Sequence, residues 1–333
     1  SEMCIRDSHY PAQSNASWYL LAENRFEEAL AHAQQGSAPQ APKRTYTLVH
    51  VARALTALGR AKEALEALEQ AELAGRAPMA GARAEALILQ GRPEQAAALL
   101  EAVKPEDGLP MWLNAQRGLV AVALDGDDGA RAKRLALRMR EMASSLPAPY
   151  PRHFTLNDLI VRSATGEAIP MESLAAIERE ARKALMDAGS PARYEEVFRY
   201  AVLAYLAQRS GQVALASRCL DWLEPEALRM RNRQVDKIVT LVRANQLRLD
   251  GRVADGVELL KPQLDGTELV QARVVMRELA RDGGDLSGIA EQERWLHEHH
   301  GQALAEVVAE QVLQPLNLVD VRTEISPEAT GVR

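Results

Sequence analysis

Residues 47–74 read TLVHVARALTALGRAKEALEALEQAELA, and this stretch decides the fold. Its first half repeats apolar residues at the i, i+3, i+4, i+7 spacing of one helical face: Leu48, Val51, Ala52, Leu55 and Leu58. Gly59 and Arg60 interrupt the pattern, which then restarts with Ala64, Leu65 and Leu68. A helix, a glycine turn and a second helix together predict a helical hairpin.

The same pattern recurs along the chain. Further turns are predicted at Asn24, Gly91, Gly126, Gly211, Gly251 and Gly284. Five places after most of these turns stands a small residue that lets paired helices approach closely: Ala29, Ala64, Ala96, Ala216 and Gly256. The turn at Gly126 is a looser copy, because Arg131 stands at that place. A period of about 32 to 40 residues predicts a helical solenoid.

The pattern resembles the tetratricopeptide repeat family. In the Gly59 hairpin the places that the family conserves are filled by Leu48, Ala52, Leu55, Ala64, Leu68 and Ala71, although the family's aromatic residues are mostly replaced. The resemblance covers most of residues 16–296. It implies an all-α fold, an α-solenoid of tetratricopeptide-like hairpins wound into a right-handed superhelix.

Breaks in the period divide the chain. We expect an N-terminal sub-array at 14–145, an irregular proline-rich connection at 146–170 and a C-terminal sub-array at 171–319. Three prolines, Pro147, Pro149 and Pro151, argue against helix at the start of the connection. Further along it, a short helix over 153–163 and a turn at 165–167 are expected. A closing helix over 302–314, stopped by Pro315, is predicted to cap the second sub-array. Residues 320–333 are expected to be a disordered tail.

Residues 1–8, SEMCIRDS, differ from the rest of the chain, since they contain neither alanine nor leucine. The string resembles a sequencing adapter translated in one frame, so residues 1–13 are expected to be adapter-derived or disordered. On this interpretation the natural N-terminus, and any domain before it, is missing. Of the two cysteines, Cys4 would then be foreign and Cys219 would be the only natural thiol.

Composition restricts the function classes. The 333 residues carry a formal net charge of -6, and only 4% are aromatic. The acidic balance argues against a nucleic-acid surface, which needs a dense positive stripe. No apolar run reaches the length of a membrane span, about 18 residues or more. We therefore expect no nucleic-acid or membrane partner and a cytoplasmic location.

Little catalytic chemistry is visible in the sequence. His297 and His300 could share a metal, but they do not complete the HExxH pattern of zinc proteases, because position 301 is glycine. We interpret them as part of a solvated helix end. Cys219 is interpreted as an inert core residue, and the tryptophans at 18, 112, 222 and 295 as packing residues. We predict no catalytic residue, no metal and no cofactor, and hence no enzyme within these residues.

The predicted architecture points to binding instead. Stacked hairpins form a concave surface lined by the first helix of each pair, where extended peptides or partner helices bind. Counting back from the glycine turns, the groove-facing places are Tyr46, Arg53, Gln116, Tyr205, Gln208, Asn245 and Arg248. Their phenol, amide and guanidinium groups suit a peptide backbone and a carboxylate. The prediction is a non-catalytic scaffold that binds a protein or peptide.

A second function class remains open. The segment from Trp295 to Asp320 resembles the end of bacterial cyclase-type proteins of peptide-modification systems, which join a nucleotide cyclase domain to helical repeats. On this alternative the chain is the C-terminal regulatory array of a larger signalling protein or transcription regulator. It would then make an intramolecular contact with a missing N-terminal domain.

Overall fold

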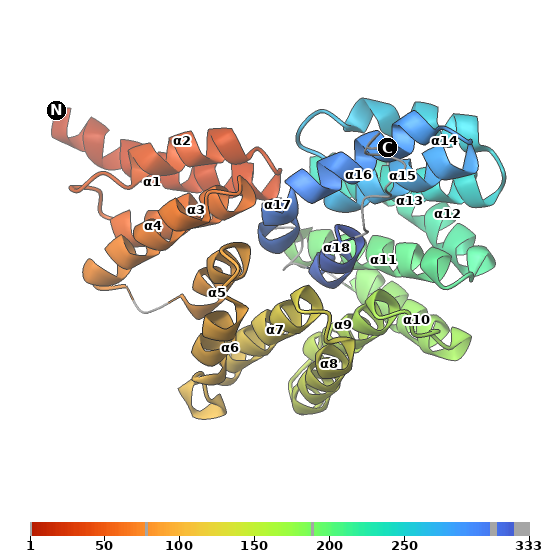
Figure 1. Ribbon diagram of the computed structural model, residues 1–333, viewed down its shortest axis with the longest axis horizontal. Coiled ribbons are helices and arrows are strands. Elements are labelled where there is room, and N and C mark those ends of the chain that lie inside the picture. The colour runs from red at the N-terminus through yellow and green to blue at the C-terminus, as the bar shows by residue number, and fades with distance from the viewer. Residues whose placement is uncertain (1, 77–78, 188–189, 307–311, 323–333) are drawn as a thin grey trace, which may run out of the picture. The chain divides into compact units, whose positions relative to one another are not determined.

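The computed structural model describes residues 2–76, 79–187, 190–306 and 312–322. Within those ranges every regular element is a helix and none is a strand, so the fold is all-α as predicted (Figure 1). The chain forms two compact units. Unit 1 comprises Ser1–Leu135 and His299–Val307, and unit 2 comprises Ala136–Glu298 and Val308–Arg333.

Unit 1 contains most of the N-terminal helices and one helix from near the C-terminus. They are α1 (Glu2–Ala22), α2 (Phe26–Gly36), α3 (Arg44–Ala57), α4 (Ala61–Leu73), α5 (Ala80–Leu89), α6 (Pro93–Glu101), the 3-10 turn η1 (Pro105–Asp107), α7 (Leu109–Asp125) and α17 (His300–Ala305). Helix α8 (Gly129–Ala143) crosses the boundary to unit 2. Residues 2–13, expected to be adapter-derived or disordered, lie in α1.

Unit 2 contains the remaining helices. They are α9 (Tyr150–Ala164), α10 (Met171–Asp187), α11 (Ser190–Arg209), α12 (Val213–Met230), α13 (Arg233–Leu249), α14 (Val253–Leu260), the 3-10 turn η2 (Lys261–Gln263), α15 (Val270–Asp282), α16 (Leu286–Glu298) and α18 (Gln314–Asp320). Of the tail expected at 320–333, Asp320 ends α18, and residues 323–333 lie outside the described residues.

Neighbouring helices pack by one scheme within each unit. In unit 1, α1, α3 and α5 pair with α2, α4 and α6, and α1, α3, α5 and α7 also contact one another in succession. In unit 2, α9, α11, α13 and α15 pair with α10, α12, α14 and α16, and the first helices again contact in succession. The side chains at these contacts are largely alanine, leucine and valine, and they form the cores of the two units.

The turn inside each hairpin has a defined hydrogen-bond pattern. After α3, Gly59 takes a left-handed φ of 76°, its N–H donates to Thr56 O at 3.0 Å, and the N–H of Arg60 donates to Leu55 O at 2.8 Å. This is the Schellman motif, which satisfies the last carbonyls of a helix and favours glycine because φ is positive. The same pair of bonds recurs with the left-handed residue at Asn24, Gly91, Asp127, Gly166, Gly211, Gly251 and Gly284.

Two of these turns differ from the sequence prediction. At the predicted Gly126 turn the left-handed residue is Asp127, with φ 58°, and Gly126 itself has φ -83°. The small residue five places after Asp127 is therefore Ala132, which is fully buried. Arg131 precedes it in the sequence and does not take the place of the small residue. The second difference concerns Gly166: a turn is expected at 165–167, but it lies inside a regular hairpin, in the stretch where the period was expected to fail.

The expected irregular connection at 146–170 contains α9, which pairs with α10 through the Gly166 turn. Pro151 does not exclude helix, because it stands in the first turn of α9, where the missing N–H has no intrahelical partner to lose. The buried residues Leu156, Leu159 and Ile160 of α9 belong to the core of unit 2.

The closing helix also differs from its prediction. Helix α17 ends at Ala305, residues 307–311 lie outside the described residues, and α18 begins at Gln314. Pro315 opens α18 rather than stopping a helix. Helix α17 packs on α3 and α5 of unit 1, and α18 packs on α9 and α15 of unit 2. In each unit the C-terminal segment thus covers first helices of hairpins.

A leucine at position 64 tests the close approach of α3 and α4. Ala64 is fully buried in the unit 1 core. The Ala64→Leu change adds volume at that contact, and we expect it to lower the free energy of unfolding by about 2 kcal/mol. Urea unfolding measures the change, with Glu66→Leu on the exposed side of α4 as the control. Equal stabilities of the two variants would contradict the packing described.

Candidate functional site

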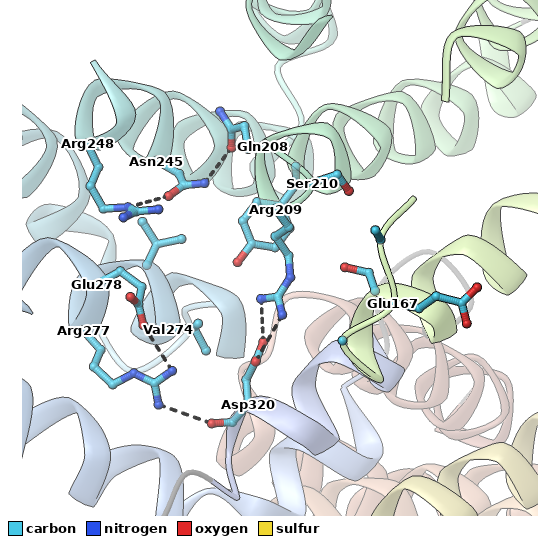
Figure 2. Close-up of a pocket in the computed structure, with 15 residues that line it drawn as sticks. Glu167, Gln208, Arg209, Ser210, Asn245, Arg248, Val274, Arg277, Glu278 and Asp320 are labelled. Carbon is cyan, nitrogen blue, oxygen red and sulfur yellow. Dashed lines mark hydrogen bonds and ion pairs between the residues drawn. The ribbon is translucent and has the colours of Figure 1, made fainter. Parts of the chain in front are cut away.

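A pocket of about 500 Å³ lies in unit 2, at the C-terminal ends of α11 and α13 and beside the middle of α15 (Figure 2). Its walls come from α11, α13 and α15, from the connection after α9, and from Asp320 at the end of α18. Four of the seven residues predicted to face a groove line it: Tyr205, Gln208, Asn245 and Arg248.

The hairpin pattern brings these four residues together. Tyr205 and Gln208 precede the Gly211 turn, and Asn245 and Arg248 precede the Gly251 turn. Residues three apart share one face of a helix. Because α11 contacts α13, the residues before these two turns come together, and α15, which contacts α13, completes the wall.

The predicted amide groups form one hydrogen-bonded chain. Asn245 Nδ2 donates to Gln208 Oε1 at 2.9 Å, and Arg248 Nε donates to Asn245 Oδ1 at 2.9 Å. Arg248 Nη1 then reaches Asp282 Oδ2 at 2.8 Å. Both amide side chains are buried, so their hydrogen bonds tie α11 to α13 and orient Arg248 at the pocket wall.

A second network holds the chain's own Asp320. Arg209 donates to both carboxylate oxygens of Asp320, at 2.9 and 3.4 Å. The amide of Gln271 donates to Asp320 Oδ2 at 3.1 Å and accepts the Tyr205 hydroxyl at 2.8 Å. Figure 2 shows Asp320 between Arg209 and Arg277, whose Nη1 lies 3.4 Å from the Asp320 carbonyl oxygen. One aspartate is thus bound through its side chain and its main chain.

Burial strengthens this network. Burial disfavours the charge on Arg209, but Asp320 and Tyr205 outweigh it and hold the pKa of Arg209 above its usual value. Burial also raises the pKa of Tyr205 to about 12, which keeps its hydroxyl a neutral donor at physiological pH. Two-point binding of a carboxylate by a partly buried guanidinium is among the stronger polar contacts in proteins.

Sequence reasoning missed several residues of this site: Arg209, Gln271, Arg277 and Asp320. Arg209 follows Tyr205 by four places, so helical spacing could have found it. Asp320 was assigned to a disordered tail, and its role follows from the docking of α18. Leu316 and Leu318 of this segment are buried, but the sequence alone does not show that they dock on unit 2.

The other three predicted residues lie in unit 1. Tyr46 and Arg53 are on α3 with Trp18 of α1 close by, because the Arg53 guanidinium lies 5.9 Å from the centroid of the Trp18 ring. Gln116 is buried in α7, and its Oε1 has no hydrogen-bond partner in the described part of the chain.

Other candidate chemistry is sparse. In the described ranges no group of three or more histidine, cysteine or acidic residues is placed to hold a metal ion. His297 is exposed in the last turn of α16, whereas His300 Nε2 lies 2.9 Å from Asp125 Oδ1 in unit 1. Cys219 is fully buried and burial raises its pKa to about 11, in agreement with an inert core thiol. No described helix has the length and apolar character that crossing a bilayer requires.

Comparison with known proteins adds no further constraint. No protein-family model and no curated protein sequence matches the chain. The function is therefore argued from the residues of the site.

Proposed function

We propose that the chain is an α-solenoid of tetratricopeptide-like hairpins wound as a right-handed superhelix. The support is the packing scheme of each unit, in which first helices contact in succession and each second helix packs on the next first helix. Repetition of the Schellman turn with a buried small residue five places later adds to it, as at Ala29, Ala64, Ala96, Ala132 and Ala216. Such an array exposes a continuous surface of first helices.

The function we propose is a non-catalytic scaffold that binds an acidic peptide or partner helix on the first-helix surface of unit 2. One observation carries this proposal: the pocket binds the carboxylate of Asp320 through Arg209 and Gln271. A partner segment with an aspartate or glutamate can make the same contacts. The proposed site needs no cofactor, and the proposed setting is cytoplasmic.

In this proposal α18 occupies the site that a partner segment would bind. Helix α18 contacts the first helices α9 and α15, which border the pocket. An external segment that takes the place of Asp320 must displace that residue from Arg209 first. The internal contact therefore reduces the apparent affinity for a partner.

A labelled peptide with the sequence of residues 312–322 tests the proposal on the full chain. We expect weak binding to the wild-type protein and at least about tenfold tighter binding to the Asp320→Ala variant, because Arg209 then has lost the carboxylate of Asp320. Adding Arg209→Gln to that variant should remove the gain. Fluorescence anisotropy measures the affinity.

Two controls make this test decisive. A peptide with asparagine in place of the aspartate should bind weakly to every variant, because it lacks the carboxylate. Arg218→Gln removes a positive charge from the exposed side of α12 and should leave the affinity unchanged. Equal binding of the two peptides, or no effect of Arg209→Gln, would reject the acidic-peptide site.

The regulatory array of a larger signalling protein is the second candidate. The pocket occupied by Asp320 favours this candidate. A segment of another domain that competes with Asp320 for Arg209 can displace α18 and so change the state of the protein. Extending the coding sequence upstream tests this candidate. An in-frame catalytic or DNA-binding domain supports it, and an immediate start codon removes it.

A further inference from the structure

A second cluster of functional side chains lies in unit 1, on the helices α1 and α3. The ring of His50 lies 4.7 Å from that of Tyr46 and 5.5 Å from that of Trp18, between ring centroids. Trp18 was predicted to be a packing residue, yet its side chain is 39% exposed, and that of Tyr46 is 43% exposed. Two large aromatic rings are thus presented to solvent around a buried imidazole.

Two arginines cover these rings. The Arg53 guanidinium lies 5.9 Å from the Trp18 ring, and that of Arg76 lies 5.5 Å from the Tyr46 ring. A guanidinium that packs on an aromatic face keeps the donors on its edge available for a ligand.

Neither arginine has a carboxylate partner within the described ranges. Each also has a buried Nε without a hydrogen-bond acceptor there. By contrast, Arg60 lies 2.6 Å from Glu63, and Arg83 lies 2.8 Å from Glu72. The positive charge of Arg53 and Arg76 is therefore left uncompensated at one place on the unit.

His50 supplies an independent observation. Only 1% of it is exposed, and its Nε2 has no hydrogen-bond partner among the described residues. Its Nδ1 lies 2.8 Å from Ser17 Oγ, and the Ser17 hydroxyl already donates to Ser14 O at 2.7 Å. Nδ1 therefore carries the proton, and Nε2 is an acceptor without a donor, an arrangement that proteins seldom leave unsatisfied.

The electrostatic setting disfavours protonation of the second ring nitrogen. Burial, followed by the positive charges of Arg53 and Arg76, lowers the pKa of His50 to about 4. The ring is therefore neutral at physiological pH. The cluster combines two uncompensated cations with one neutral acceptor, all within unit 1.

We propose that Arg53 and Arg76, with Trp18, Tyr46 and His50, form a binding site for an oxyanion, a carboxylate or a phosphate. The two guanidiniums bind the anion, and the aromatic rings hold the guanidiniums in place. A ligand that also carries an N–H or O–H group satisfies His50 Nε2. The site shares no residue with the unit 2 pocket. It therefore goes beyond the proposed function, and its test is independent of the test of that function.

Calorimetric titration of the full chain tests this site with three probes. They are inorganic phosphate, N-acetylaspartate amide and the matched neutral compound N-acetylasparagine amide. We expect saturable binding of at least one anion and none of the neutral compound. Arg53→Gln and Arg76→Gln should each weaken the binding by about tenfold or more. Arg60→Gln removes the same charge at an exposed turn and should have no effect.

The ring contacts give a second readout. Anion binding should change the fluorescence of Trp18, and Trp18→Phe should abolish that change. Arg53→Lys keeps the charge without the planar fork and should bind with intermediate affinity, which separates a lost contact from a lost fold.

The two anions distinguish the source of the oxyanion. Binding of the aspartate compound alone identifies a carboxylate ligand, and binding of phosphate alone identifies a phosphoryl group. Absence of binding by both anions overturns the proposal. So does binding that survives both glutamine substitutions unchanged.

Discussion

Replacing Gly301 with alanine is expected to destabilise unit 1 by about 3 kcal/mol, although the same change usually stabilises a helix. A Cβ at position 301 would overlap the carbonyl oxygen of Thr56 and lie 3.0 Å from Gly59 N. Both atoms belong to the backbone at the turn between α3 and α4, which cannot move aside as a side chain can. Helix α17 must therefore shift away from α3.

The cost follows from what α17 buries. Leu304 and Ala305 are fully buried, and Glu306 accepts a hydrogen bond from Asn24 Nδ2 at 2.8 Å. A displaced α17 loses this burial and exposes part of α3, and a buried leucine alone contributes about 1.5 to 3 kcal/mol. We expect faster hydrogen exchange in α17 and in the last turn of α3.

A second helical glycine of unit 1 provides the matched control. Nothing lies within 4 Å of a Cβ built at Gly81 in α5. Gly81→Ala is therefore expected to stabilise unit 1 by up to about 1 kcal/mol, through helix propensity alone. Urea unfolding of both variants should give shifts of opposite sign. A Gly301→Ala protein as stable as the unchanged one would show that α17 does not dock on α3.

The helical hairpins could be predicted from sequence because their signals are local. Gly59, Gly91, Gly211 and Gly251 all take left-handed φ angles at the expected places. The turn at Asp127 was placed one residue early, because glycine is the usual left-handed residue and aspartate adopts that conformation less often. A helix over 153–163 and a turn at 165–167 were expected, but they were not recognised as half of a hairpin, because the nearby prolines break the repeat pattern.

The candidate site could be predicted only in part, because local spacing does not reveal contacts between distant segments. Helical spacing and the glycine turns located Tyr205, Gln208, Asn245 and Arg248, which do line one pocket. Spacing does not reveal which side chains bond to each other, so the amide chain through Gln208 and Asn245 was not foreseen. The docking of α17 and α18 depends on contacts between segments far apart in sequence, such as Asp320 with Arg209, and no local pattern encodes them.

The buried imidazole of His50 leads to the second large effect, which depends on pH. Its pKa falls from 6.5 to about 4 in the folded state, chiefly because of burial and secondarily because of Arg53 and Arg76. Between these two values the unfolded chain binds a proton that the folded chain excludes. Stability is therefore complete above about pH 6.5 and falls with pH, by up to about 1.4 kcal/mol per unit and about 3 kcal/mol in total near pH 4.

His50→Asn should remove this dependence, because asparagine does not titrate. The variant is expected to be less stable than the unchanged protein at about pH 7, where it loses ring contacts with Tyr46, and to lose the extra slope between about pH 6.5 and 4. Carboxylates that protonate below about pH 5 affect both proteins alike, so the difference between the two urea-unfolding curves isolates the imidazole. His297→Asn makes the same exchange at an exposed position and serves as the matched control. A slope equally steep in the His50→Asn protein would mean that other groups cause the loss, and that the imidazole is not excluded from protonation by the fold.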